Sequence, residues 1–460
     1  MNLFNLKIFK DSIYFKVIFL VWTLIYTLTK GQHIAGYFSL PLIAWGGILV
    51  LRNIFSKKNN MNKVTIVSIY LFLIAYVVTI IVNIENNFVG NTKTLIWQAI
   101  MMFVLFMSES WKSKEELIED IITICKTIIV ISFIFSLISI ALFLLNIQYQ
   151  SERIDGRMIY QGYFQARLWG IYVDPNQASA LAQVSIMASA IILLLKNGKF
   201  KKLAISNIII QYIFMILAAS RGGEIAFTLG CLVMIYLLFE YILRKKLTNR
   251  AISIILSSIL SVVVTVGIIY SAAPTRSILV NIPNFAGGVR NEINKNTDLN
   301  IGSVTEDVVV ERDDLESTNG RDILWKDGFR LIKYSPILGF GDRNISLKAA
   351  EFTPGSSLEK KTVHNGFIEM VLSGGIVALL IMLVLILATM IAAIRVLFSK
   401  RRYNKDFYLI NMISVIVGIV LCTSIFLTEI FYKNSFAATV FWIFMGYSIC
   451  LSNIYLKEGK

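Results

Sequence analysis

Residues 366–394 have the sequence GFIEMVLSGGIVALLIMLVLILATMIAAI, in which Glu369 is the one charged side chain. A helix rises about 1.5 Å per residue, so about 20 apolar residues cross the roughly 30 Å hydrocarbon core of a membrane. The stretch exceeds that minimum and is almost entirely apolar. It therefore predicts a membrane-spanning helix.

Comparable apolar runs recur along the chain, without the period-two alternation that is typical of outer-membrane β-strands. No small-residue cleavage site follows the first run, so we do not interpret that run as a signal peptide. We predict an all-α polytopic membrane protein, with about twelve spans in a single integral membrane domain, residues 1–460. The predicted spans are residues 13–29, 34–51, 64–83, 94–108, 121–145, 176–195, 203–219, 225–243, 251–271, 366–394, 407–427 and 436–454.

The overall composition supports this fold class. Hydrophobic residues make up 56 % of the chain and charged residues 16 %, whereas a soluble domain has roughly 25 % charged residues. This composition excludes a soluble enzyme, a disordered chain and a disulfide-stapled secreted domain. The cysteines lie inside apolar runs at spacings that match no metal site, so we expect them to be buried. They are Cys125, Cys231, Cys422 and Cys450.

Basic residues set the expected orientation. The net charge is +15, and we attribute it to the cytoplasmic retention of Lys and Arg beside membrane helices rather than to nucleic acid binding. We predict a multi-pass protein of the cytoplasmic membrane with both termini in the cytoplasm. The basic residues that carry this prediction include Arg52, Lys57, Lys58, Lys63, Lys196, Lys199, Lys201, Lys202, Arg244, Lys245, Lys246, Arg250, Arg395, Lys400, Arg401, Arg402 and Lys405.

This topology leaves two long segments outside, residues 146–175 and residues 272–365. The second is a large extracytoplasmic loop between the ninth and tenth spans, and such loops are usually functional or disordered. Its first half, Asn291–Asn319, is polar, and we expect it to be mobile. Its second half has apolar residues at near-helical spacing, which predicts a packed helix. These residues are Ile323, Leu324, Trp325, Phe329, Leu331 and Ile332.

Four polar clusters lie on the predicted outer face, where charges are candidates for function. The first runs from Arg167 to Asn176, and its end, Asp174-Pro175-Asn176, is typical of a helix start. Either this cluster only caps the sixth span, or Arg167 and Asn176 also line an outward cavity.

The second cluster is Ser220-Arg221-Gly222-Gly223-Glu224, between the seventh and eighth spans. Its glycines allow close approach of the backbone, and an arginine at a helix end suits a phosphate or a diphosphate. The alternative is a turn in which Arg221 pairs with Glu224.

The third cluster is Asn319-Gly320-Arg321, followed by a glycine-rich turn at residues 335–341. Arg321 is either an anion ligand or a solvated loop charge. The turn lacks the lysine and the serine of a P-loop, so we expect its role to be structural.

The fourth cluster is His364-Asn365, followed by Glu369 on the same helix face. A histidine at the mouth of a membrane helix can act as a base near neutral pH. The alternative is an interfacial histidine bound to a backbone group. Two arginines and a histidine around one outer cavity could bind an anionic lipid-linked donor and deprotonate a hydroxyl.

We expect neither a metal nor a cofactor. The chain has only two histidines, His33 and His364, and neither a P-loop nor a glycine-rich dinucleotide motif. The paired acids Asp313-Asp314 are weak evidence for a metal site.

The order of these motifs resembles the O-antigen ligase and Wzy-type polysaccharide polymerase family. The resemblance covers residues 165–380, whereas the first five spans agree with the family only in number and hydropathy. The motifs that carry it are Gly170-x-x-x-Asp174-Pro175-Asn176, Ser220-Arg221-Gly222, Gly320-Arg321-x-x-x-Trp325, Pro336-x-x-Gly339-x-Gly341 and His364-Asn365 leading to Gly374-Gly375.

The resemblance implies a GT-C-like glycosyltransferase that transfers a glycan from undecaprenyl diphosphate at the outer membrane face, with inversion and without metal. By position, Arg221 and Arg321 match the arginines that bind the diphosphate. His364 matches the histidine that assists the acceptor hydroxyl. The expected substrate-binding residues are Arg167, Asn176, Arg343 as a third cation, and Asn365 or Glu369 as the group that orients the histidine ring.

Three functions remain open. The chain is rich in Lys, Ile and Asn, as is typical of AT-rich Gram-positive bacteria that make capsule or exopolysaccharide but no lipopolysaccharide. This favours a polymerase of lipid-linked repeat units over an O-antigen ligase that transfers the glycan to another acceptor. A flippase for lipid-linked oligosaccharides is the alternative of another class, but we expect it to have polar residues deep in several spans and no large outer loop. The expected partners of a polymerase are the lipid-linked donor and acceptor, a flippase and chain-length regulators, but no nucleic acid.

Overall fold

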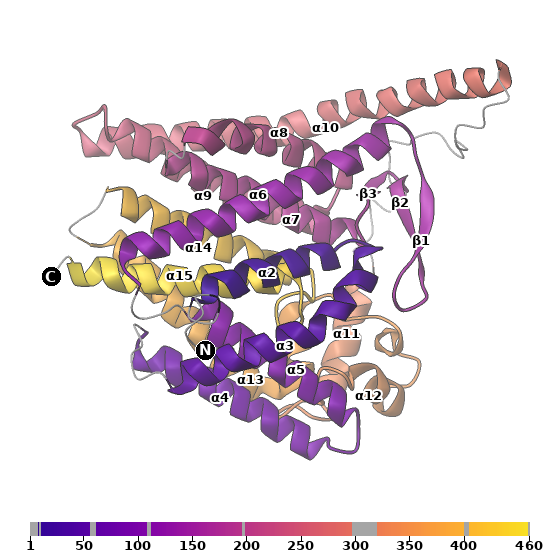
Figure 1. The fold of residues 1–460 in the computed structure, drawn as a ribbon, viewed down its shortest axis with the longest axis vertical. Coiled ribbons are helices and arrows are strands. Elements are labelled where there is room, and N and C mark those ends of the chain that lie inside the picture. The colour runs from indigo at the N-terminus through magenta and orange to yellow at the C-terminus, as the bar shows by residue number, and fades with distance from the viewer. Residues whose placement is uncertain are drawn as a thin grey trace. The chain divides into compact units, whose positions relative to one another are not determined.

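A computed structural model describes residues 8, 11–55, 61–107, 112–195, 198–296, 320–399 and 404–458, with the backbone alone for residues 284–296. Among these residues, eleven helices are long and apolar enough to cross a membrane, and α2 (Ser12–Tyr26) is a shorter apolar helix. Each predicted span coincides with one of these helices (Figure 1). The prediction of an all-α polytopic membrane protein is therefore confirmed.

The spanning helices follow the order of the predicted spans. They are α3 (Gly31–Phe55), α4 (Lys63–Val82), α5 (Phe88–Ile100) with the π-helical turn Met101–Phe106, α6 (Lys114–Leu144), α7 (Pro175–Leu194), α8 (Lys201–Ala218), α9 (Arg221–Leu243), α10 (Arg250–Asn296), α13 (Gly366–Leu397), α14 (Lys405–Ser424) and α15 (Phe436–Glu458).

The chain forms two compact units. Unit 1 comprises Met1–Leu20, Ser39–Ile121 and Glu316–Lys460, and unit 2 comprises Val21–Phe38 and Ile122–Leu315. In unit 1, α15 is largely buried and packs against α13 and α14, while α13 also packs against α4. In unit 2, α7 is the most buried spanning helix and packs against α8 and α9.

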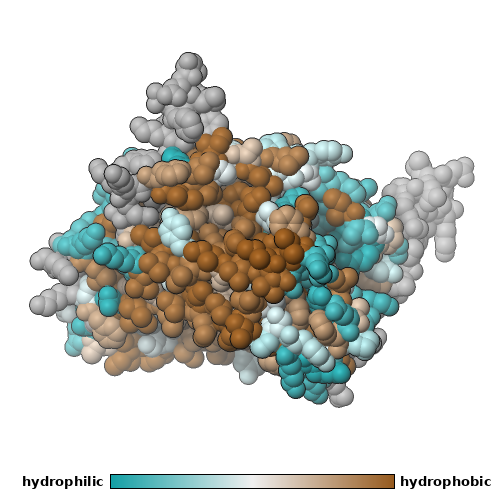
Figure 2. Space-filling model, turned by 90° about the horizontal axis from the view of Figure 1, so that it is seen from below, coloured by the Kyte–Doolittle hydropathy of each residue, from teal (hydrophilic) through white to brown (hydrophobic). Residues whose placement is uncertain are grey.

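The surface of the spanning helices is apolar. On α4, exposed hydrophobic side chains recur every three or four residues, which places them on one helix face. Figure 2 shows a broad hydrophobic area on one face of the protein, with hydrophilic residues toward its edges. Such a surface suits lipid tails rather than water. The exposed residues of α4 include Val67, Leu71, Ile74, Val78 and Ile81.

Buried polar side chains join α7 and α8 inside unit 2. The Asn207 amide donates to Ser185 Oγ at 2.8 Å and to Ser189 Oγ at 2.9 Å, and Gln211 Nε2 donates to Asn207 Oδ1 at 3.1 Å. Hydrogen bonds of this kind hold membrane helices together. Polar residues therefore do lie deep within these two spans, as expected of a flippase, so this feature does not disfavour that alternative.

A small antiparallel sheet lies within residues 146–175, where the sequence analysis predicts no strand. It consists of β1 (Tyr149–Glu152), β2 (Met158–Phe164) and β3 (Arg167–Gly170) in that order. Gly162 has φ +86°, and a Cβ there would lie 2.2 Å from the Ile147 carbonyl oxygen. Glycine is therefore required where β2 bends at a bulge.

The predicted long loop begins differently from what was expected. Helix α10 continues to Asn296, well past residue 271, so the segment starts as a helix. Its second half contains α11 (Arg321–Ile332) and α12 (Ile345–Phe352), which confirms the predicted short helix. Residues 297–319, which include Asp313 and Asp314, lie outside the described residues.

Helix α11 buries a narrower face than its apolar pattern predicts. Leu324 and Leu331 lie in a buried hydrophobic cluster. Ile323 and Phe329 are exposed, because they lie on another face of the helix.

Candidate functional site

Arg321 is the first residue of α11. Gly320 precedes it with φ +71°, a left-handed conformation that glycine adopts without strain. The Arg321 guanidinium lies over the Phe426 ring, with Cζ 5.6 Å from the ring centroid. Stacking on an aromatic face holds the cation in place, and the helix N-terminus adds further positive potential. This half-buried arginine is therefore suited to an anion.

His364 and Asn365 lead into α13. Asn365 caps the helix, and its Oδ1 accepts hydrogen bonds from the backbone N–H groups of Phe367 and Ile368, both at 3.0 Å. His364 has φ +49°, an uncommon conformation for a residue with a side chain. The half-buried imidazole is thus presented at the end of a capped helix.

Helix α13 is interrupted within the membrane span. Gly375 has φ +71° and ψ −179°, so the helix ends and restarts there. The glycine-rich turn at residues 335–341 fills this break. The Phe340 N–H donates to the Leu372 carbonyl oxygen, and the Gly341 N–H donates to the Ser373 carbonyl oxygen, both at 2.8 Å. The turn thereby satisfies backbone groups of the broken helix, which supports its structural interpretation.

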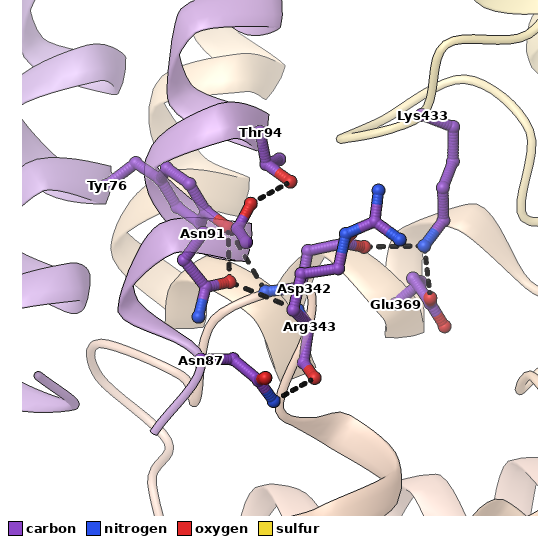
Figure 3. Close-up of polar contacts among 9 residues, drawn as sticks. Tyr76, Asn87, Asn91, Thr94, Asp342, Arg343, Glu369 and Lys433 are labelled. Atoms are coloured by element: carbon purple, nitrogen blue, oxygen red, sulfur yellow. Dashed lines mark hydrogen bonds and ion pairs between the residues drawn. The ribbon is translucent and has the colours of Figure 1, made fainter. Parts of the chain in front are cut away.

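A group of three buried charges lies beside this break (Figure 3). Lys433 Nζ lies 2.5 Å from Asp342 Oδ1 and 3.0 Å from Glu369 Oε1. The side chains of Asp342 and Glu369 are 1 % and 4 % exposed. Burial alone would lower the pKa of Lys433, but the charges of the two carboxylates and the hydrogen bonds to them outweigh burial and raise that pKa above its ordinary value.

Glu369 is therefore paired with Lys433, whereas the sequence analysis considered it for orienting His364. The sequence analysis also missed Lys433 and Asp342. A usable signal for Lys433 was its position in the short connection between two strongly apolar spans, α14 and α15. No local sequence pattern links Lys433 to Asp342 or Glu369, because both are distant from it in the chain.

The Arg343 side chain is 58 % exposed, and its Nε lies 3.5 Å from Asp342 Oδ2. Its backbone is held on both sides, because its N–H donates to Asn91 Oδ1 and its carbonyl accepts from the Asn87 amide, each at 3.1 Å. Tyr76 donates to the same Asn91 oxygen at 3.1 Å. The Arg343 backbone is therefore fixed, while its partly exposed head group lies beside Asp342 (Figure 3).

Arg167 and Asn176 are brought together in unit 2. Arg167 Nη2 donates to Asn176 Oδ1 at 2.7 Å, and its Nε donates to the Ala218 carbonyl at 3.0 Å. Asp174 caps α7 by accepting from the Asn176 N–H at 2.7 Å. The cap predicted at Asp174-Pro175-Asn176 is confirmed, and the same residues hold an arginine.

Arg221 is the first residue of α9, and Ser220 is its N-cap, accepting from the Gly223 N–H at 3.3 Å. The two glycines therefore lie in the first helical turn. A Cβ at Gly223 would lie 2.6 Å from Ser179 Oγ and 2.8 Å from Gln183 Nε2. Glycine is needed there because α7 approaches α9 closely, and the half-buried Arg221 stands at the helix N-terminus.

Unit 2 also contains Arg276, which is not among the site residues predicted from the sequence. Arg276, on α10, donates to the Ala166 carbonyl and lies 3.4 Å from the Tyr163 hydroxyl. Burial raises the pKa of Tyr163, and the hydrogen bond from Arg276 partly opposes that shift. The sequence signal for Arg276 was its position just beyond the predicted span 251–271.

The candidate residues are thus divided between the two units. Unit 2 holds Arg167, Asn176 and Arg221, and unit 1 holds Arg321, Arg343, His364, Asn365 and Glu369.

Comparison with known protein families gives a match for part of the chain. No curated protein is significantly similar to the chain. Residues 206–383 match the model of the O-antigen ligase family, a range that includes Arg221, Arg321 and His364 but not Arg167, Asn176 or Lys433. The resemblance to the O-antigen ligase and Wzy-type polymerase family is thereby confirmed.

Proposed function

We propose that the protein is a polymerase that joins undecaprenyl-diphosphate-linked oligosaccharide repeat units at the outer face of the cytoplasmic membrane. The family match supports the coarser function, which is ligase-type or polymerase-type transfer of a lipid-linked glycan. The composition argument favours the polymerase, with capsular polysaccharide, exopolysaccharide or O-antigen as product. Flippase and chain-length regulator proteins are its proposed partners.

The observation that carries the proposal is the placement of Arg321 and His364. They stand at the N-terminal ends of α11 and α13, two helices that pack against each other in unit 1. A cation and a base are thus held at the N-terminal ends of two helices that pack against each other, where the backbone also favours an anion. A diphosphate ester beside a hydroxyl is the substrate pair that such a site suits.

In the proposed reaction, the acceptor hydroxyl attacks the anomeric carbon of the lipid-linked sugar, and the bond from that carbon to the diphosphate breaks with inversion. Diphosphate is a good leaving group, so activation of the hydroxyl is the harder task. Neutral His364 accepts the hydroxyl proton. Arg321 stabilises the charge that develops on the leaving diphosphate, and the family resemblance gives Arg221 the same role.

The test is a purified assay in lipid vesicles with the lipid-linked repeat unit as the only substrate. A polymerase yields a ladder of longer lipid-linked glycans. A product that forms only after another acceptor is added would identify a ligase, and movement of the substrate across the vesicle without any new glycosidic bond would identify a flippase.

Substitutions in that assay test the residue roles. General-base catalysis contributes about 10²–10⁴-fold, so His364→Ala should lose activity by that factor while still binding the donor. Arg221→Ala and Arg321→Ala should each lose about ten- to 150-fold, since a charge-assisted contact contributes about 1.5–3 kcal/mol. The control is Arg330→Ala on α11, which removes an arginine side chain that is 65 % exposed and should change little. Polymer formation by His364→Ala within about twofold of the unmodified protein would remove the base from the mechanism.

A further inference from the structure

Lys433 joins segments that are far apart in the chain. It lies between α14 and α15, and its ammonium group contacts Asp342 at 2.5 Å and Glu369 at 3.0 Å (Figure 3). Asp342 follows the glycine-rich turn, and Glu369 lies in the first turn of α13. One lysine therefore ties three segments together at a single point.

The two carboxylates depend on this lysine. They are almost fully buried, whereas the Lys433 side chain is 26 % exposed and can supply a charge from the edge of the cluster. Arg343 is the other cation near Asp342, but it lies farther away, at 3.5 Å, and is 58 % exposed. Removing one partner of a buried ion pair leaves an uncompensated charge and forces the neighbouring segments to rearrange.

The segment that Glu369 anchors is short. The break at Gly375 separates Gly366–Gly374 from the remainder of α13. A helix piece of this length is not stable by itself, so its direction depends on contacts with its neighbours. The Lys433–Glu369 ion pair is one such contact, and the hydrogen bond from the Gly341 N–H to the Ser373 carbonyl at 2.8 Å is another.

His364 is attached to the end of this piece. Its left-handed backbone conformation, φ +49°, is uncommon for histidine and persists only where the surrounding structure enforces it. The start of α13 contributes to this, because Asn365 caps the helix directly after His364. A change in the direction of Gly366–Gly374 would therefore move the imidazole.

We infer that Lys433 is a positioning residue, which fixes the first piece of α13 through Glu369 and Asp342 and thereby fixes the imidazole of His364. The inference rests on the proposed role of His364 as the base. It extends the site beyond the residues that match the family model, since Lys433 lies outside residues 206–383.

The experiment compares Lys433→Met with a matched control, Lys114→Met. Lys114 also bridges two carboxylates in unit 1, at 3.0 Å from Asp406 and 3.2 Å from Glu458, and its side chain is 22 % exposed. Both substitutions are made in a His33→Asn background, in which His364 is the only remaining histidine. The measurements are kcat, the donor KM, and the rate at which diethyl pyrocarbonate modifies the imidazole.

A misplacement of about 1 Å can cost on the order of 10²-fold in rate. We expect Lys433→Met to lower kcat by about ten- to 100-fold with the donor KM within about threefold, and to change the imidazole modification rate at least about threefold. Lys433→Arg keeps the charge, so kcat and the imidazole modification rate should both stay close to those of the background protein. Lys114→Met should leave kcat and the modification rate within about twofold of the background protein.

Three results would overturn the inference: an unchanged modification rate in Lys433→Met, an equal change in Lys114→Met, or no loss of kcat. If Lys433→Met does not fold, the triple variant Asp342→Asn, Glu369→Gln, Lys433→Met removes all three buried charges together. The inference predicts low kcat and an altered modification rate in that variant, whereas wild-type values would show that the lysine acts only as a counter-charge. An active His364→Ala would overturn the proposed base, but the modification rates would still test the link between Lys433 and His364.

Discussion

Lys112 and Lys433 each lie between two carboxylates in unit 1, and their surroundings differ in how completely the polar atoms are hydrogen-bonded. In the α6 cluster, Lys112 lies 2.7 Å from Asp11 and 2.6 Å from Asp120, and the Tyr447 hydroxyl donates to Asp120 at 3.0 Å. The α13 cluster consists of Asp342, Glu369 and Lys433 (Figure 3), together with Tyr432, which precedes Lys433 in the chain.

The α13 cluster contains buried polar atoms without a hydrogen bond to any described residue. They include Glu369 Oε2, Tyr432 Oη and Asp342 Oδ2, the last of which still lies 3.5 Å from Arg343 Nε. Among the described residues, no carboxylate oxygen of Asp11 or Asp120 is a buried atom without a hydrogen bond. Unsatisfied buried groups are uncommon in native proteins and gather where function competes with stability. From this comparison we expect the α6 cluster to serve stability and the α13 cluster to serve the proposed site.

The first prediction, with the largest expected effect, concerns which helix ends lie on which side of the membrane. Lys114 contacts Asp406 in the first turn of α14 and Glu458 at the end of α15, whereas Lys433 lies at the opposite ends of both helices. We expect the Lys433 end to face outward and the Lys114 end to face the cytoplasm.

An impermeant thiol reagent checks this topology in intact cells. Cysteine in place of Lys361, an exposed residue near His364, should react fully. Cysteine in place of Lys457, an exposed residue near the end of α15, should react only after lysis. Both variants carry Cys422→Ser, because Cys422 is the one partly exposed natural cysteine. Labelling of the Lys457 variant in intact cells would show that the orientation is opposite to the predicted one.

The second prediction concerns stability. Lys112→Met removes the cation that contacts both Asp11 and Asp120, and the Lys112 side chain is only 3 % exposed. The free energy of unfolding should fall by about 3–5 kcal/mol, as is typical of a broken buried pair. The activity per folded molecule should stay the same, in contrast to Lys433→Met. Unfolding in mixed detergent micelles and activity on the same samples measure both quantities. A loss of specific activity without a loss of stability would remove the distinction between the two regions.

Sequence reasoning predicted the parts of this molecule that depend on local pattern. Long apolar runs identify the spans because the membrane demands about 20 apolar residues. The cap at Asp174 and the helix at residues 321–332 follow from capping chemistry and helical spacing. Each of these signals is contained within a few helical turns.

The remaining features depend on contacts between distant residues. Lys433 is separated from Asp342 by 91 residues, and no local pattern links them. The extension of α10 to Asn296 was missed because a fall in hydropathy marks the end of a span but not the end of a helix. The match to residues 206–383 agrees with the motif order, but it does not assign the roles of Arg221, Arg321 or His364.

The third prediction compares two glycines. A Cβ at Gly375 would lie 1.9 Å from the Ile337 carbonyl oxygen, and one at Gly446, on α15, would lie 1.9 Å from the Phe106 carbonyl oxygen. Gly375 also has a backbone conformation that is essentially restricted to glycine, with φ +71° and ψ −179°.

Both glycine variants should be destabilised, but to different degrees. Gly375→Ala should lower the free energy of unfolding by about 2–4 kcal/mol, and Gly446→Ala by about 1–3 kcal/mol. Only Gly375→Ala should also reduce the activity per folded molecule, because it displaces the turn that fills the break in α13. Equal effects on activity would show that close packing, rather than the broken helix, governs both positions.

The smallest expected effect tests the comparison most directly. Tyr432 and Tyr447 are both almost fully buried, at 2 % and 1 % exposed. The Tyr447 hydroxyl donates to Asp120, whereas the Tyr432 hydroxyl has no hydrogen bond to any described residue, although its ring lies 4.6 Å from that of Tyr76. Replacement by phenylalanine removes the hydroxyl and keeps the ring.

Tyr447→Phe should lower the free energy of unfolding by about 1.5 kcal/mol, because a hydrogen bond to a charged acceptor is lost. Tyr432→Phe should change it by less than about 0.5 kcal/mol, because removing an unsatisfied buried hydroxyl is nearly neutral. Unfolding of both variants in the same detergent mixture gives the difference. If Tyr432→Phe is destabilised as much as Tyr447→Phe, then the Tyr432 hydroxyl is hydrogen-bonded in the working protein, to water or to a bound group. The α13 cluster would then be as well satisfied as the α6 cluster, and its link to function would rest on Lys433 and His364 alone.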